Sequence, residues 1–288
     1  MSVLHGLIKY NLGVNLGDVV QSIAAAQFID PVIYFDRDLP SHTVIPPGLG
    51  QVSLIMNAYW SGWDGKNPTW LQEMPLDARI KPLWISSHFD GGCTFTPEII
   101  AYLKRFEPIG CRDNWSLKKI QALGIDAYFS NCLTITLTNT TPDKRGDDIY
   151  IVDIPKDVYS RFPEEILDNA TFLTHNSVWA KDNIKRGSLY KFDEAQLLLE
   201  KYMSAKLVIT SRLHCATPCL AFNTPVVFIG RKETFYRVNC LEEYIPIYSF
   251  DDFGGIDWCI NSIKSQINYH NVEKTKKLLK SKINNFLK

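Results

Sequence analysis

Residues 207–229 read LVITSRLHCATPCLAFNTPVVFI, and they contain the pattern on which the fold prediction rests. The two ends, Leu207–Thr210 and Val226–Ile229, are short apolar runs rich in β-branched residues, as buried parallel strands are. Between them, Arg212–Phe222 has the length and composition of a helix. A strand, a helix and a second strand in this order form a βαβ unit, which predicts an α/β fold with parallel strands.

The same alternation extends over most of the chain on both sides of this unit. Further strands are expected at Val3–Tyr10, Pro31–Phe35, Val52–Met56, Leu83–Ser86, Ile109–Cys111, Ala127–Phe129, Ile149–Ile154 and Ala170–Leu173. Further helices are expected at Asp18–Phe28, Pro97–Phe106, Asp113–Leu123, Phe192–Met203 and, as a basic amphipathic helix, Val272–Leu287.

The alternation is interrupted once, by the segment TNTTPDKRGDD at residues 138–148. This segment is polar, contains proline and glycine, and has no apolar residue, which is typical of a linker. A chain of 288 residues is long enough for about two domains. We therefore predict an N-terminal domain at residues 1–138 and a C-terminal domain at residues 147–288.

The overall composition excludes several classes of protein. Lys and Arg together number 31, as do Asp and Glu, so the net charge is zero, which argues against broad binding to nucleic acid. No apolar run approaches the ~18 residues of a membrane span, and the N-terminus lacks the features of a signal peptide. The seven cysteines include no CxxC pair, and the histidines have no partners at metal-ligand spacing, so we predict no metal site. These features favour a cytoplasmic protein.

A glycine- and asparagine-rich turn, NLGVNLGD at residues 11–18, joins the first expected strand to the first helix. Its glycines permit close approach of a ligand to the backbone, and the free N–H groups of the helix would favour an anion or a polar sugar group. Asn15 and Gly17 are therefore candidate substrate-binding residues. From spacing alone, an ordinary turn with Asp18 as N-cap is favoured, since the pattern is neither a P-loop nor GxGxxG.

Two arginines are expected directly after strands, where ligands bind in open parallel sheets. Arg112 precedes Asp113, a suitable helix N-cap, while Arg212 and His214 follow Ser211, the expected N-cap of the next helix. Positive side chains are disfavoured in a first helical turn unless an anion is bound there. Taken singly, the Arg112 segment is better explained by a surface arginine in an ion pair. For the Arg212 and His214 segment, a surface arginine with a buried structural histidine is about as good an explanation as a binding site.

Taken in order, these segments resemble the polysaccharide pyruvyl transferase family. The resemblance rests on Asn15-Leu-Gly-Asp18, on Arg112-Asp113 with Ser116, on Phe129–Leu137, and most strongly on Thr210-Ser-Arg-Leu-His214 continuing to Ile229. It implies two Rossmann-like domains facing a cleft, as in GT-B glycosyltransferases. The chain departs from the family pattern at Val19 and Val20, where Glu-Ala often follows the Gly-Asp pair.

The resemblance also implies the reaction, which is transfer of the pyruvyl group of phosphoenolpyruvate to a sugar or glycan acceptor as a cyclic ketal, without a cofactor. It assigns donor binding to Arg112, Arg212 and the Leu213 backbone, and places His214 as the essential histidine. Guanidinium forks suit the carboxylate and phosphate of such a donor, and an imidazole near neutral pKa suits a general acid. Asp18 is the expected base, and His88 is the next acid after His214.

Two other functions remain open on the sequence. A GT-B glycosyltransferase that uses a nucleotide sugar would have the same fold, so the donor decides between the two enzymes. A sugar-binding homologue without catalysis would bind ligands without turnover. The crowding of Tyr59, Trp60, Trp63 and Trp70 suits either stacking on a sugar or, more commonly, an aromatic core cluster.

Overall fold

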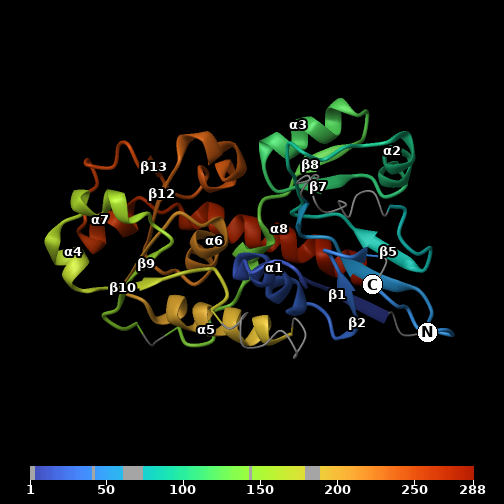
Figure 1. Cartoon of the computed structure of the whole chain (residues 1–288), viewed down its shortest axis with the longest axis horizontal. Helices are drawn as coiled ribbons and strands as arrows, with labels where there is room; N and C mark the ends of the chain where they lie inside the picture. The colour runs from blue at the N-terminus through green and yellow to red at the C-terminus, as the bar shows by residue number, and fades with distance from the viewer. Residues whose placement is uncertain (1–3, 41–42, 61–73, 143–144, 179–188) are drawn as a thin grey trace.

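The computed structural model describes residues 4–40, 43–60, 74–142, 145–178 and 189–288, and its two larger sheets lie side by side along the long axis of the molecule (Figure 1). Every strand pair in them is parallel. The N-terminal sheet has the order β2 (Pro31–Asp36), β1 (Leu4–Lys9), β3 (Val52–Ile55) and β5 (Ile80–Leu83). The C-terminal sheet has the order β10 (Ala170–Leu173), β9 (Ile149–Val152), β11 (Leu207–Thr210), β12 (Val226–Gly230) and β13 (Ile247–Ser249).

Two short parallel pairs complete the strands of the described chain: β4 (Tyr59–Trp60) with β6 (His88–Phe89), and β7 (Ile109–Cys111) with β8 (Ala127–Phe129). The helices are α1 (Leu16–Ala26), α2 (Pro97–Lys104), α3 (Asn114–Ala122), α4 (Glu164–Asp168), α5 (Tyr190–Ser204), α6 (Leu213–Ala221), α7 (Ile260–Ser265) and α8 (Tyr269–Leu287). The 3-10 turns are η3 (Leu133–Thr136), η4 (Lys156–Arg161), η6 (Lys232–Arg237) and η7 (Asn239–Leu241).

The mixed α/β architecture with parallel strands confirms the fold class expected from the sequence. Expected helix caps are also present, since Thr96 accepts from the amide of Ile99 and Asp113 from the amide of Ser116. The strand expected at Leu83–Ser86 is wrong, because β5 ends at Leu83 and Ser86 has a positive φ of 55°. The following residues, Trp84 and Ile85, are buried but do not belong to β5. They are apolar because they are buried in the core, and not because they form part of a strand.

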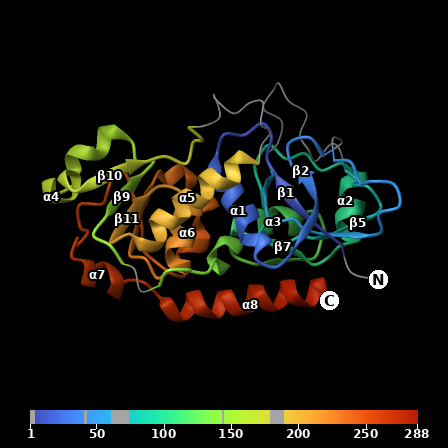
Figure 2. The ribbon, with the colours of Figure 1, turned by 90° about the horizontal axis from the view of Figure 1, so that it is seen from below.

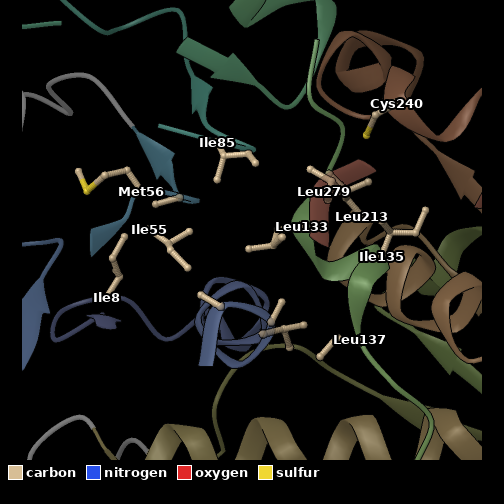
Figure 3. Packing of buried hydrophobic residues seen from close by; sticks show 14 of the residues in the cluster. Ile8, Ile55, Met56, Ile85, Leu133, Ile135, Leu137, Leu213, Cys240 and Leu279 are labelled. Atoms are coloured by element: carbon tan, nitrogen blue, oxygen red, sulfur yellow. The ribbon is translucent and has the colours of Figure 1, made fainter. Parts of the chain in front are cut away.

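A buried group of apolar residues connects the elements between the two sheets (Figure 3). The 3-10 turn η3 lies at its centre, in contact with α1, α6 and α8. Leu133 and Ile135 are almost fully buried there, and the hydroxyls of Thr134 in η3 and Thr217 in α6 are 2.5 Å apart. Because α1 and α6 both pack on η3, their N-terminal ends are held near each other.

Helix α8 runs beneath both sheets, from the C-terminal half of the molecule back to the N-terminal half (Figure 2). Its apolar stripe is buried at Val272, Leu279 and Ile283, as expected for an amphipathic helix. Its far end meets the N-terminal half, where the ammonium of Lys282 lies 4.1 Å from the ring centre of Tyr128. The described residues between 138 and 148, which join the two sheets, are exposed or half-buried.

Candidate functional site

A cavity of about 520 Å³ lies where loops from both sheets meet. Six of its polar residues come within two positions of the end of a parallel strand: Arg37 after β2, Arg112 after β7, Asp153 after β9, His175 after β10, Arg212 after β11 and Arg231 after β12. These residues lie beyond the carboxyl ends of the strands, which is where ligands bind in open parallel sheets. The cavity also receives Asn15, Gly17 and Asp18 from α1 and Leu213 and His214 from α6.

The start of α1 is anchored by both halves of the chain. Asn15 is the N-cap, and its side chain accepts from the amide of Gly17 at 3.0 Å. The amide of Leu16 donates to the carbonyl of His175 at 2.7 Å. The alternative in which Asp18 caps the helix is therefore wrong, because Asn15 already occupies that position and Asp18 lies in the first turn.

Asp18 is a buried carboxylate on the cavity wall, with its residue only 8% exposed. Burial raises the pKa of Asp18, and the guanidinium of Arg37, 3.8 Å away, opposes that rise in part. Arg37 makes its closer ion pair with Asp38, at 2.7 Å. Asp18 is consequently a stronger base than an exposed aspartate.

Arg112 and His214 are brought together although they lie 102 residues apart in the chain. Arg112 is 2% exposed, and its Nη1 lies 3.2 Å from Nε2 of His214. Because a guanidinium can only donate, His214 accepts at Nε2 and is held as the neutral imidazole. Burial, and secondarily the charge of Arg112, lowers the pKa of His214 well below its usual value.

Arg212 is oriented by the carboxylate of Asp153, which accepts from its Nε at 2.8 Å. The Arg212 side chain is 41% exposed and lines the cavity. Ser211 is not the N-cap of α6 as expected; Arg212 holds that position without a side-chain cap. The reason is that the hydroxyl of Ser211 donates instead to the carbonyl of Asp153, directly after the neighbouring strand β9, at 2.7 Å.

Asp153 organises this side of the cavity. Its backbone has a positive φ of 51°, which is rare for a residue with a side chain and is found where surrounding structure enforces it. Besides Arg212, its carboxylate accepts from the amide of His175 at 2.9 Å. Burial alone would raise the pKa of Asp153, but the hydrogen bonds from the His175 amide, Thr174 and Arg212 lower it.

His175 is a second imidazole in the cavity wall, and its sequence context marks it only as a histidine without partners at metal-ligand spacing. It is 1% exposed, and its Nε2 lies 2.9 Å from the hydroxyl of Tyr202. Within the described chain, its Nδ1 is buried without a hydrogen-bond partner. Arg37, Asp153, Arg231 and Arg237 were missed in the same way. Their position directly after apolar strands, or shortly after β12 for Arg237, was the available signal.

Gly17 allows the two imidazoles to approach α1 closely. A Cβ atom added to Gly17 would lie 3.2 Å from Nδ1 of His175, 3.2 Å from Nδ1 of His214 and 3.1 Å from Oδ1 of Asn15. Both imidazole Nδ1 atoms therefore lie close to the first turn of α1 and to each other. Any larger residue at position 17 would press on them.

His88, the second acid expected from the sequence, does not line the cavity. It is fully buried, its Nδ1 is 2.5 Å from Asp113, and the ring of Tyr59 stacks on it at 5.0 Å. Trp60 is a buried core residue, while Trp63 and Trp70 lie outside the described residues. Only Tyr59 of the aromatic group reaches the cavity wall within the described chain.

The cavity is strongly cationic, with five arginines against two aspartates in its wall, and it also contains the imidazoles of His175 and His214. Within the described residues there is no cluster of three or more His, Cys, Asp and Glu side chains placed to hold a metal ion. Nor does any helix in the described ranges have the length and apolar content needed to cross a membrane. The chemistry that the wall offers is recognition of a small multiply charged anion beside an imidazole.

Comparison with known proteins agrees with the resemblance found in the motifs. A family model described as polysaccharide pyruvyl transferase matches residues 15–233, and so covers most of the chain and every cavity residue up to Arg231. No curated protein matches the chain. A solved structure of a functionally uncharacterised protein from Klebsiella pneumoniae is similar in fold, with 16% identity and a TM-score of 0.51 over 83% of this chain and 87% of that one.

Proposed function

The chain belongs to the polysaccharide pyruvyl transferase family and is a transferase, and we propose that it moves the pyruvyl group of phosphoenolpyruvate onto two hydroxyls of a sugar to form a cyclic ketal. The observation that carries this proposal is the meeting of Arg112, Arg212 and His214, from opposite halves of the chain, in one arginine-rich cavity. Phosphoenolpyruvate carries a carboxylate and a phosphate, and two guanidinium groups can each grip one of them.

In the proposed complex, Arg212 holds the donor with its two terminal nitrogens, because its Nε is already bonded to Asp153. The Nη1 group of Arg112, which faces His214 in the free protein, donates a hydrogen bond to phosphoenolpyruvate in the complex. The backbone of Leu213 at the start of α6 adds an N–H group to the anion site. Arg231 and Arg237 in the same wall add positive charge to the field that attracts the donor.

The proton transfers use His214 and Asp18. When the donor anion binds, it draws the Arg112 guanidinium and raises the pKa of His214, which then gains a proton. His214 delivers this proton to the methylene carbon of the donor, and a sugar hydroxyl attacks the adjacent carbon. Asp18 accepts the proton of that hydroxyl, supported by its raised pKa. Phosphate then leaves with the proton held by Asp18. A second hydroxyl attacks the same carbon to close the ketal and gives its proton to the now neutral His214.

The acceptor is placed beside α1 in this proposal, where Asn15, Gly17 and Asp18 line the cavity next to His214 in α6. We also propose a GT-B-like division into domains at residues 1–138 and 147–288, supported by the two sheets whose strand ends border the cavity. Because phosphoenolpyruvate is made in the cytoplasm, we place the reaction there.

The decisive experiment combines the chain with phosphoenolpyruvate and a panel of glycosides carrying free hydroxyl pairs, and reads pyruvyl ketals by mass spectrometry together with released phosphate. Both products should appear in equal amounts, and His214→Gln should lose both. Thermal stabilisation by nucleotide sugars but not by phosphoenolpyruvate would favour the glycosyltransferase alternative. Binding of sugar without any turnover would favour a homologue that has lost catalysis.

A further inference from the structure

Two exposed aromatic side chains meet outside the cavity, and they come from opposite halves of the chain. Trp115 in α3 is 44% exposed and Tyr236 in η6 is 40% exposed, although their ring centres are only 5.0 Å apart with planes inclined by 52°. A pair that served only to close the two halves on each other would bury these surfaces. Here both rings leave a large part of their area open to solvent.

This pair is continuous with the cavity through Tyr59 and Arg237. Tyr59 lines the cavity, and the guanidinium of Arg237, which follows Tyr236 in the chain, lies 4.9 Å from the Tyr59 ring centre. Tyr236 is near enough to Tyr59 that it adds to the rise in the pKa of Tyr59, which burial chiefly causes. Tyr59 and the pair of Tyr236 and Trp115 are therefore connected through Arg237, and the three residues together are named here the aromatic row, which extends from the cavity wall to the surface at Trp115.

Polar groups accompany the row at its inner end. The hydroxyl of Tyr59 donates to the carboxylate of Asp90 at 2.7 Å, and Arg237 is among the cavity arginines that form no ion pair with a carboxylate in the described chain. Aromatic faces beside such groups suit a sugar chain, whose C–H faces stack on rings while its hydroxyls bond to charged side chains. A wholly apolar ligand could not form hydrogen bonds with these polar side chains.

We propose that the aromatic row is a subsite for an extended glycan, in which sugars behind the terminal residue of the acceptor stack on Tyr236 and Trp115. This inference rests on the proposed function and names the acceptor as an oligosaccharide or longer chain. A cavity of about 520 Å³ that also holds the donor cannot contain such a chain, so the following sugars must leave over the rim. The row lies where they would emerge.

The test measures glycan binding without the donor, so that it does not depend on turnover. Wild-type protein, Trp115→Ala and Tyr236→Ala are applied to an array of immobilised mono- to hexasaccharides. The matched control is Phe172→Ala, because Phe172 is 48% exposed and stacks on Tyr159 at 4.9 Å but does not line the cavity. We expect wild type and the control to bind a subset of the longer glycans, and each row variant to bind them about tenfold more weakly, the effect of an aromatic contact worth roughly 1.4 kcal/mol.

Monosaccharide binding and affinity for phosphoenolpyruvate should be the same in all four proteins. Absence of oligosaccharide binding by the wild type would overturn the proposal, as would unchanged binding by both row variants. A lower unfolding temperature in the row variants with unchanged glycan binding would show that the pair only joins the two halves. Glycan binding that depends on the aromatic row, without pyruvyl transfer to any acceptor, would contradict the proposed function but support the proposed glycan subsite.

Discussion

The replacement Gly17→Ala separates the catalytic geometry from the stability of α1. In an ordinary helix this change is stabilising by about 0.5–1 kcal/mol, because alanine has less backbone freedom to lose on folding. Here the new methyl group would meet Asn15, His175 and His214 at 3.1–3.2 Å, closer than such contacts normally are. The neighbouring side chains must therefore move by a few tenths of an ångström.

The two effects on folding have opposite signs, so we expect little change in the unfolding temperature. Turnover, in contrast, should only decrease. Since a displacement of about 1 Å at a reacting group can cost about a hundredfold, a shift of a few tenths of an ångström at His214 should lower turnover roughly tenfold. Steady-state release of phosphate from phosphoenolpyruvate in the presence of an acceptor measures this, and thermal unfolding measures stability.

Gly13→Ala is the matched control, because Gly13 lies in the same turn and a Cβ there has no neighbour within 4 Å. This variant should keep wild-type turnover. If Gly17→Ala and Gly13→Ala both keep wild-type turnover, the imidazoles do not need their present distance from α1, and the proposed role of this turn is refuted. If both variants lose activity equally, the loss comes from the backbone of the turn and not from the contacts of position 17.

Further predictions follow from the same site. Arg212→Lys should weaken binding of phosphoenolpyruvate by about ten- to a hundredfold, since a charged hydrogen bond worth about 1.5–3 kcal/mol is lost along with the orienting bond to Asp153; equal affinity by calorimetry would contradict it. His214→Gln should lower ketal formation by about a hundred- to ten-thousandfold with an unchanged circular dichroism spectrum, and near-normal turnover would make His214 a structural residue. The pKa of His214 is low in the free protein and should be higher in the complex, so donor binding should take up a proton and strengthen as the pH falls between those two values. Calorimetry in buffers of different ionisation enthalpy measures this uptake, with His214→Gln correcting for protons bound by the donor itself. Limited proteolysis should cut first within residues 138–148, and early cleavage elsewhere with this segment intact would count against the proposed division into domains.

The sequence predicted the parts of the fold that depend on short-range patterns. Apolar runs identified β7, β8, β10 and β11 at the bounds that the structure has, and Asp113 was recognised as an N-cap from its place before a helix. Where an apolar run had a different cause, as at Trp84 and Ile85, the same reasoning failed, because burial does not require pairing in a sheet.

The candidate site was predictable only where a local motif marked it. Arg112, Arg212 and His214 were found because each follows a strand within a motif, and the structure brings all three to one cavity. Ser211 was misassigned because its partner, the carbonyl of Asp153, lies 58 residues earlier in the chain. His88 was overvalued because nothing local shows that Tyr59 covers it.

The sequence by itself determined the α/β fold class and most of the strands and helices, since these follow from periodicity and capping within a few residues. It also singled out Arg112, Arg212 and His214, whose expected roles came from the resemblance to a family. Only the tertiary structure decided that His175 faces His214 across Gly17, that Asp153 orients Arg212, and that Tyr236 meets Trp115. Such pairs join residues far apart in the chain, and their contacts depend on how α1, α6 and α8 pack around η3. That packing results from the burial of many apolar side chains that come from segments far apart in the chain, so no single segment of sequence predicts it.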